Sequence, residues 1–164
     1  EIMKIYNKQP AHVTKHSSCG VIVPGVDTIA VSLANCCRPI PGDSIIGYIS
    51  KGQGVKVHRA DCPNIVNEKK RLIPVQWEEG LDEKQYEVNL IIHSDDRNYL
   101  LSDIVTTLQQ CNVYLKHVDS AVDDGNLEAT TKLTVSVKNA AHLQNLISNL
   151  KKVRSVNEVI RTIQ

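Results

Sequence analysis

The chain has 164 residues, of which 41% are hydrophobic and 23% charged, and its formal net charge is +1. This composition is ordinary for a globular protein, and the near-zero net charge excludes a polybasic nucleic-acid binder that uses its whole surface. There is no signal peptide and no apolar run near the ~20 residues of a membrane helix, so we expect a cytoplasmic protein that makes no membrane contact.

The N-terminal segment, residues 1–19, is expected to be the tail of a helix and a polar connector. Pro10 breaks the helical pattern, and the residues that follow it have no apolar period. His12 and His16 have a spacing that suits a metal site on a helix, but no matching carboxylate or cysteine accompanies them. We therefore favour a connector. Since the chain begins with Glu1, it reads as a piece of a longer protein.

Residues 20–77 are predicted to form a small, mostly antiparallel sheet with one short helix. Pro41-Gly42-Asp43 and Lys51-Gly52-Gln53-Gly54 supply turns. Asp61 can cap a helix that runs toward Glu68. Apolar and polar residues alternate in about four strands, near Ile29–Leu33, Ile45–Ile49, Val55–Val57 and Ile73–Trp77.

A charged stretch, residues 78–83, is the predicted linker to a second domain over residues 84–164. Strand and helix patterns alternate there. The Asp123-Asp124-Gly125-Asn126 sequence predicts a hairpin, Asn139 caps a helix, and residues 94–98 offer several caps for an earlier helix. The order β-α-β-β-α-β is ferredoxin-like, so the fold class of the whole chain is α+β.

Three of the five cysteines and one histidine lie close together in the sequence. An odd number of cysteines without a signal peptide fits a reducing compartment better than a disulfide framework. Zinc prefers four nitrogen or sulfur ligands, and the pairs Cys36/Cys37 and His58/Cys62 offer them. Adjacent cysteines can both bind one ion only where the backbone turns. The alternative is a structural role, with one cysteine buried and His58 hydrogen-bonded locally. A catalytic cysteine is disfavoured, since no His and Asp/Asn partners converge by any pattern.

The same block, Cys36-Cys37-Arg38-Pro39-Ile40-Pro41-Gly42-Asp43 followed by residues 47–64, closely resembles the C-terminal regulatory region of the long RelA/SpoT-homologue (Rel) family. The resemblance extends from about Gly20 to the end. It implies a zinc-finger-like, ribosome–intersubunit module followed by an ACT domain. Family members make and hydrolyse the alarmone (p)ppGpp of the stringent response as GTP pyrophosphokinases or hydrolases. Their catalytic domains lie upstream, so this chain is expected not to be an enzyme.

The resemblance also implies partners. The family's C-terminal half contacts the ribosome and uncharged tRNA and relays control to the catalytic domains of the same protein. Basic residues beside glycine turns suit RNA phosphates, which position a module without reading sequence. We expect contact with ribosomal RNA and tRNA through Arg38, Lys51, Lys56 and Arg59. The other reading is an ordinary solvated lysine and arginine surface.

ACT domains characteristically pair side by side and bind an amino acid beside the first helix, which implies a homodimer and a branched-chain amino-acid ligand. The corresponding loop holds Asp95, Asp96, Arg97, Asn98 and Tyr99. It departs from the family pattern because Tyr99 stands where glycine is expected, and a tyrosine there obstructs access to the backbone. A packing and dimerisation role is therefore favoured. The alternative function is a stand-alone ACT-type amino-acid-sensing regulator of metabolism.

Overall fold

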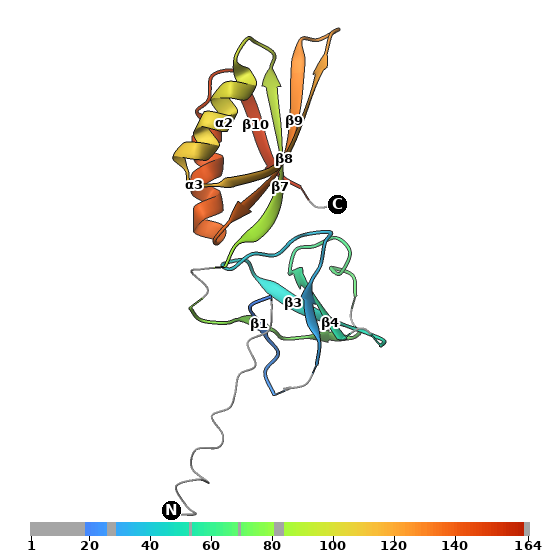
Figure 1. Cartoon of the computed structure of the whole chain (residues 1–164). Helices are drawn as coiled ribbons and strands as arrows, with labels where there is room; N and C mark the ends of the chain where they lie inside the picture. Colours follow the sequence, from blue (N-terminus) through green and yellow to red (C-terminus); the bar gives the residue numbers. More distant parts are fainter. Residues whose placement is uncertain (1–18, 26–28, 53, 69, 81–83, 163–164) are drawn as a thin grey trace, which may run out of the picture. The chain divides into compact units, whose positions relative to one another are not determined.

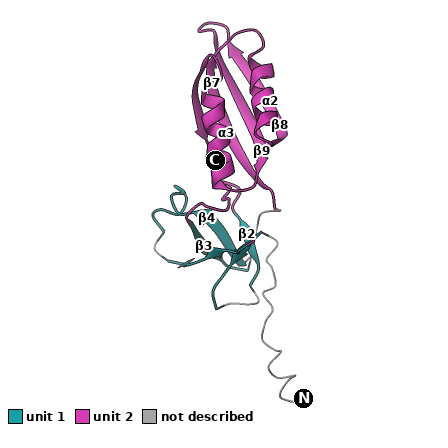
Figure 2. Ribbon diagram, turned by 90° about the vertical axis from the view of Figure 1, so that its left-hand side faces the viewer, with its two compact units in different colours: residues 1–33, 45–79 teal, residues 34–44, 80–164 magenta. Residues whose placement is uncertain are grey.

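The computed structural model describes residues 19–25, 29–52, 54–68, 70–80 and 84–162. The expected connector at 1–18, with His12 and His16, lies outside these residues, as do positions 81–83 of the linker. The chain separates into two compact units, one of residues 1–33 and 45–79 and one of residues 34–44 and 80–164 (Figure 2). The second unit thus includes a short segment, 34–44, from the middle of the cysteine block. We call it the turn segment.

The first unit is built on a four-stranded sheet (Figure 1). Its core contains the buried residues Val21, Val23, Val55 and Val57. The central pair is antiparallel, whereas the edge strand β2 runs parallel to β4. In sheet order, the strands are β2 (Val31–Leu33), β4 (Gly54–Arg59), β3 (Ile45–Ser50) and β5 (Leu72–Ile73).

Two details of this unit differ from the sequence-based expectation. The strand expected near residues 73–77 is two strands, because Pro74 lacks an N–H and interrupts the ladder. Ile73 pairs with β3, while β6 (Gln76–Trp77) pairs with β1 (Val21–Ile22). The short helix expected between Asp61 and Glu68 is also wrong. That segment forms successive turns, with the N–H groups of Ile65 and Val66 donating to the Cys62 carbonyl.

The second unit has the predicted β-α-β-β-α-β order. Its antiparallel sheet runs β10-β7-β9-β8, and both helices cover one face of it (Figure 1). Buried side chains alternate along β7, which is the pattern of a sheet covered on one face. The elements are β7 (Tyr86–Asp95), α2 (Leu100–Gln110), β8 (Tyr114–Asp123), β9 (Glu128–Val137), α3 (Ala140–Lys151) and β10 (Val156–Arg161).

The two helices begin differently. The Asn139 side chain accepts a 2.8 Å hydrogen bond from the backbone N–H of His142, so the predicted cap of α3 is confirmed. None of residues 94–98 caps α2. Its first flanking residue is Tyr99, whose side chain makes no capping hydrogen bond. In the described part of the chain, no helix is both long and apolar enough to span a membrane.

Candidate functional site

The backbone turns at the adjacent cysteines, as joint ligation would require. The N–H of Arg38 donates to the carbonyl of Ala34 at 3.1 Å, and Arg38 has a left-handed φ of 43°. Residues 35–37 therefore form a turn and not a strand. In such a turn, neighbouring side chains no longer point to opposite faces. Cys36 is half-buried and Cys37 is buried, with 1% of its surface exposed.

His58 and Cys62 come from the end of β4 and the turn after it. Val55 and Val57 point into the core, so His58 lies on the opposite face of the strand, as Lys56 does. The N–H of Cys62 donates to the Arg59 carbonyl at 3.0 Å, and the Cys62 side chain is fully buried. Burial and, to a lesser extent, the charge of Lys56 lower the pKa of His58, which favours the neutral imidazole that metals bind.

These four side chains form a cluster. The ligand atoms of Cys36, Cys37, His58 and Cys62 all lie within 4.8 Å of one another. A tetrahedral zinc with Zn–S bonds of 2.3 Å would separate its sulfur ligands by about 3.8 Å, so a small contraction brings this set to coordination distance. No pair of the five cysteines forms a disulfide. Three thiols and one imidazole are a donor set that zinc prefers, and the residues fit a metal ion.

The basic residues expected to bind RNA have different surroundings. Lys51 is exposed in the turn between β3 and β4, and Lys56 is half-buried within β4. Arg59 forms an ion pair with Asp61 at 3.0 Å. Arg38 belongs to the second unit, where its Nη1 donates to Glu87 at 2.6 Å. The two lysines, by contrast, make no ion pair within the described residues.

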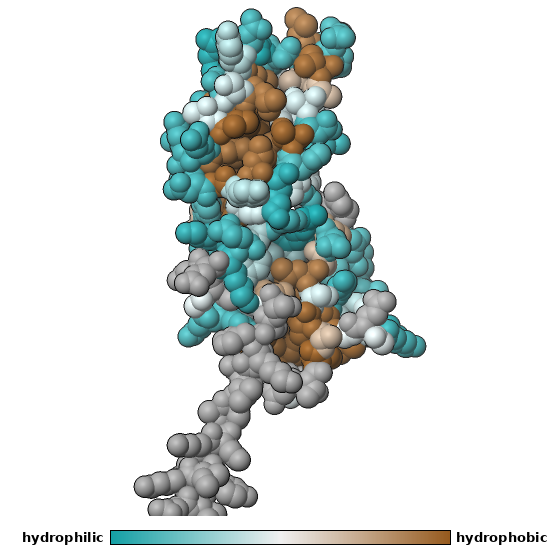
Figure 3. Space-filling model, in the orientation of Figure 1, coloured by the Kyte–Doolittle hydropathy of each residue, from teal (hydrophilic) through white to brown (hydrophobic). Residues whose placement is uncertain are grey.

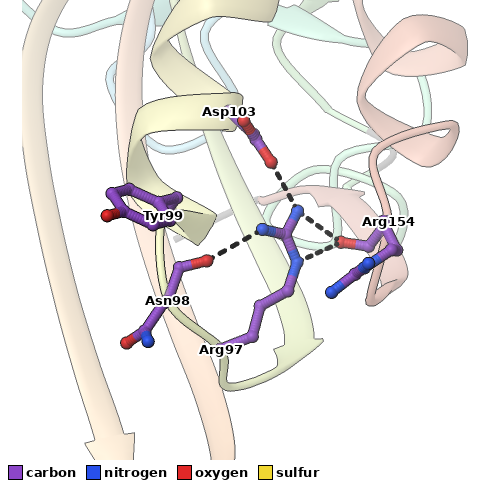
Figure 4. A pocket seen from close by; sticks show the side chains of 5 residues that line it. All are labelled: Arg97, Asn98, Tyr99, Asp103 and Arg154. Atoms are coloured by element: carbon purple, nitrogen blue, oxygen red, sulfur yellow. Dashed lines mark hydrogen bonds and ion pairs between the residues drawn. The ribbon is translucent and has the colours of Figure 1, made fainter.

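The loop before α2 lines an open cavity of about 600 Å³ (Figure 4). Arg97, Asn98 and Tyr99 of the expected ligand loop line it, whereas Asp95 and Asp96 do not. Asp95 instead accepts a hydrogen bond from Asn157 at 3.2 Å. Sequence reasoning missed the other lining residues, Asp103 and Arg154. Asp103 follows in the first turn of α2, but nothing in the sequence indicates that Arg154 folds back onto this loop.

The donors of Arg97 are used within the protein. Its Nη2 pairs with Asp103 at 2.6 Å and also donates to the Arg154 carbonyl at 3.0 Å. Nε reaches Ser155 Oγ at 3.2 Å, and Nη1 reaches the Asn98 carbonyl at 3.0 Å. Figure 4 shows this side chain bridging the loop before α2 and the backbone at Arg154. Arg97 therefore holds the two loops together and has little left to offer a ligand carboxylate.

Tyr99 occupies a backbone position that favours glycine. Its φ is 64°, in the left-handed region, and its side chain is 80% exposed beside the cavity. A glycine expected at this position from the family pattern would adopt that φ without strain. The tyrosine thus imposes a backbone cost without gaining burial, and it lines the cavity directly before α2.

Comparison with known families accounts for both units. The RelA/SpoT RIS domain matches residues 21–78, and an ACT domain matches residues 82–161. The chain is the RIS–ACT region of a RelA/SpoT protein. All four members of the cluster, Cys36, Cys37, His58 and Cys62, lie within the RIS match, and the Arg97–Tyr99 loop lies within the ACT match.

Individual relatives have consistent names. The chain is 35% identical to the GTP pyrophosphokinase of Haemophilus influenzae over 151 residues, covering 90% of this chain and 20% of that protein. It is 33% identical to the bifunctional (p)ppGpp synthase/hydrolase RelA of Mycobacterium tuberculosis, covering 87% and 19%. The chain spans about a fifth of the length of these relatives. A crystal structure of the ACT domain of a Chlorobium tepidum GTP pyrophosphokinase covers 48% of this RIS–ACT chain and 99% of that domain, with 24% identity and a TM-score of 0.43.

The left-handed backbone at Tyr99 leads to a stability prediction. Tyr99→Gly should raise the free energy of unfolding of the ACT domain by about 1 kcal/mol, because glycine removes the penalty of a positive φ. Tyr99→Ala should give no such gain, since alanine loses the ring but keeps the penalty. Urea denaturation followed by circular dichroism measures both variants. A Tyr99→Gly variant no more stable than Tyr99→Ala would contradict the strain argument.

Proposed function

We propose that this chain is the non-catalytic regulatory region of a (p)ppGpp synthetase/hydrolase, and that it relays contact with the ribosome and uncharged tRNA to catalytic domains of the same protein. The observation that carries the proposal is the succession of a RIS domain and an ACT domain in one chain. We assign the RIS module to residues 20–77, the linker to 78–83 and the ACT domain to 84–164.

Two features support a binding role over a catalytic one. The glycine-rich sequence Lys51–Gly54 connects two antiparallel strands, β3 and β4, and so does not open a helix as a nucleotide-binding loop does. Of the charged residues that line the cavity of the ACT domain, Arg97 and Asp103 are paired with each other. The alternative, a stand-alone amino-acid-sensing regulator, leaves the RIS module without a role.

The RNA contact is assigned to the hairpin of β3 and β4. Lys51 and Lys56 extend from it, and Gly52 and Gly54 have positive φ values of 75° and 81° in the intervening turn. A Cβ on Gly54 would lie 2.2 Å from the Ala30 carbonyl oxygen, so the close approach of the backbone at Ala30 requires glycine at this position. Arg38 and Arg59, whose charges are paired with Glu87 and Asp61, contribute less to the proposed contact.

The double variant Lys51→Ala/Lys56→Ala should bind ribosomes more weakly. The dependence of log K on log salt should become shallower by about one unit per lysine, because each lysine that contacts a phosphate releases counterions. Ribosome pelleting at several salt concentrations measures both quantities. The control is Lys132→Ala/Lys138→Ala, which removes two exposed lysines of the ACT domain. An unchanged salt dependence in the Lys51/Lys56 variant would contradict the proposal that these lysines contact RNA phosphates.

We further propose zinc as the ion of the Cys/His cluster. Zinc would fix the turn at Cys36 and Cys37 relative to His58 and Cys62, as structural zinc sites do in small sheets. Chain purified without chelator should contain about one zinc per molecule. Cobalt substitution should produce the near-ultraviolet absorption of thiolate–cobalt bonds.

Cys62→Ser should abolish zinc retention, whereas Cys111→Ser should not, since Cys111 lies in the ACT domain and outside the cluster. Metal analysis after equilibrium dialysis decides the question. Chain that retains no zinc when dialysed against excess ion would overturn this assignment and leave the family role standing.

For the ACT domain we propose packing and pairing, and not the sensing of a branched-chain amino acid. Arg97 is committed to Asp103 and the Arg154 carbonyl, and Tyr99 stands at the cavity. Titration calorimetry with valine and isoleucine separates the two roles, since a clear heat of binding would favour sensing.

The surface of the ACT domain favours pairing with a second copy. Strand β8 is an edge of the sheet, and Leu101 and Val105, one turn apart on α2, are 42% and 41% exposed. Val122 of β8 is 45% exposed. Figure 3 shows an apolar area over the region of α2 and β8. An open edge strand flanked by apolar side chains is a template for strand pairing, and a side-by-side homodimer would cover it.

Val105→Glu should therefore shift the chain toward the monomer, because it places a charge within the paired surface. Light scattering coupled to size exclusion, over a range of concentrations, measures the shift. Val66→Glu is the matched control, since Val66 is a 60% exposed valine of the RIS domain. A native chain that stays monomeric at high concentration would contradict the pairing.

A further inference from the structure

The turn segment of the cysteine block is attached to the ACT sheet by a bidentate ion pair. Arg161, at the end of β10, donates from Nη1 to Asp43 Oδ1 at 3.0 Å and from Nη2 to Asp43 Oδ2 at 2.8 Å. Both side chains are only 13% exposed, so the pair is shielded from solvent and counterions. The two residues are 118 positions apart in the chain. Both belong to the second unit.

Asp43 also organises the turn in which it lies. Its Oδ2 accepts a hydrogen bond from the N–H of Ile40 at 2.9 Å, and its own N–H donates to the Ile40 carbonyl at 3.0 Å. Arg161 reaches further along the segment, since its Nη2 donates to the Arg38 carbonyl at 2.8 Å. Arg38 directly follows the two candidate ligands Cys36 and Cys37. One guanidinium thus holds both ends of the stretch 38–43.

Other contacts bring the turn segment close to α3. The Pro41 carbonyl accepts a 2.7 Å hydrogen bond from the N–H of Ala140, a donor in the first turn of α3 that has no partner inside the helix. Gly42 has a φ of 102°, and a Cβ there would lie 2.7 Å from the Cβ of Ala140. Ile40, between these contacts, is fully buried. The turn segment therefore packs as part of the ACT domain, although the RIS match includes it.

We infer that Asp43 and Arg161 are positioning residues for the Cys/His cluster, so that the placement of the Cys36–Cys37 turn depends on the last strand of the ACT sheet. Two measurements test this inference, and only the second of them, zinc affinity, depends on the metal-binding role proposed for the cluster. The first readout, the protection of the cysteine thiols, does not involve a metal.

The first test measures thiol labelling in the metal-free chain. Cys37 is buried in the native protein and should react slowly with iodoacetamide. Arg161→Gln and, separately, Asp43→Asn should speed labelling of Cys37 by about tenfold or more, since hydrogen bonds to charged groups are lost. Arg161→Lys should lie between, because lysine keeps the charge and loses the fork. Peptide mapping by mass spectrometry assigns the labelled cysteine.

Two controls separate positioning from general loosening of the ACT domain. Cys111, buried between the helices and 8% exposed, reports on the ACT core and should stay protected in every variant. Glu158→Gln removes an exposed charge from the same strand, β10, and should leave Cys37 protected. Unchanged labelling of Cys37 in Arg161→Gln and Asp43→Asn would overturn the inference. Equal acceleration at Cys37 and Cys111 would also overturn it, since the pair would then be a general stabiliser.

The second readout is zinc affinity, measured by competition with a chromophoric chelator. Arg161→Gln should weaken it by about tenfold or more, while Glu158→Gln should not. Should the native chain bind no zinc, the proposed metal fails, while the labelling of Cys37 still decides the positioning role. Should the variants label faster but bind zinc as the native chain does, the turn is held by Arg161 but the claim for the cluster is wrong.

Discussion

The Asp43–Arg161 ion pair is the constraint on which the arrangement of the candidate site depends. A turn of eleven residues, 34–44, has too few apolar side chains to hold a fixed shape alone, and its two prolines and one glycine define bends without stabilising them. The guanidinium fork supplies the missing contacts by binding the Asp43 carboxylate and the Arg38 carbonyl together. Because the pair is mostly shielded from water, loss of one partner would leave an uncompensated charge, which costs far more than an exposed pair is worth.

A second arginine has a similar role in the loop before α2. Arg97 holds that loop against the backbone before β10, so arginines at two places on one sheet hold adjoining loops. The backbone of this loop is strained at Tyr99, because the residue before the helix is in the left-handed region and offers no side-chain cap. In an amino-acid-binding loop, an arginine with uncommitted donors and a glycine would leave the helix N–H groups accessible. Here the donors of Arg97 are committed within the protein and Tyr99 stands in place of the glycine, which favours a structural role.

The sequence predicted the periodic parts of the fold and missed the parts that depend on distant contacts. The alternating strands, the Asn139 cap and the β-α-β-β-α-β order follow from local patterns, and the structure confirms them. The helix expected after Asp61 was wrong because a suitable cap at Asp61 does not suffice where only a few residues follow before the next turn. The sequence spacing alone predicted that Cys36, Cys37, His58 and Cys62 lie close together, since residues that bind one metal ion must be neighbours in space. No pattern in the sequence indicates that Asp43 and Arg161, which are 118 positions apart, form an ion pair.

The distribution of charge follows from these contacts. Arg38, Arg59, Arg97 and Arg161 are each bound to a carboxylate within the protein, whereas Lys51 and Lys56 form no such pair in the described residues. Arginine suits such internal pairs because its planar fork binds a carboxylate and a carbonyl at once. In the proposed RNA contact, the flexible and hydrated ammonium of a lysine would bind a phosphate as a point charge. The arginines therefore stabilise the units, and a near-neutral chain still presents unpaired positive charge at the β3–β4 hairpin. By linkage, the proposed dependence of the cluster on Arg161 is reciprocal. A ligand that binds Cys36 and Cys37 in their folded positions would also stabilise β10, the edge strand of the ACT sheet opposite β8.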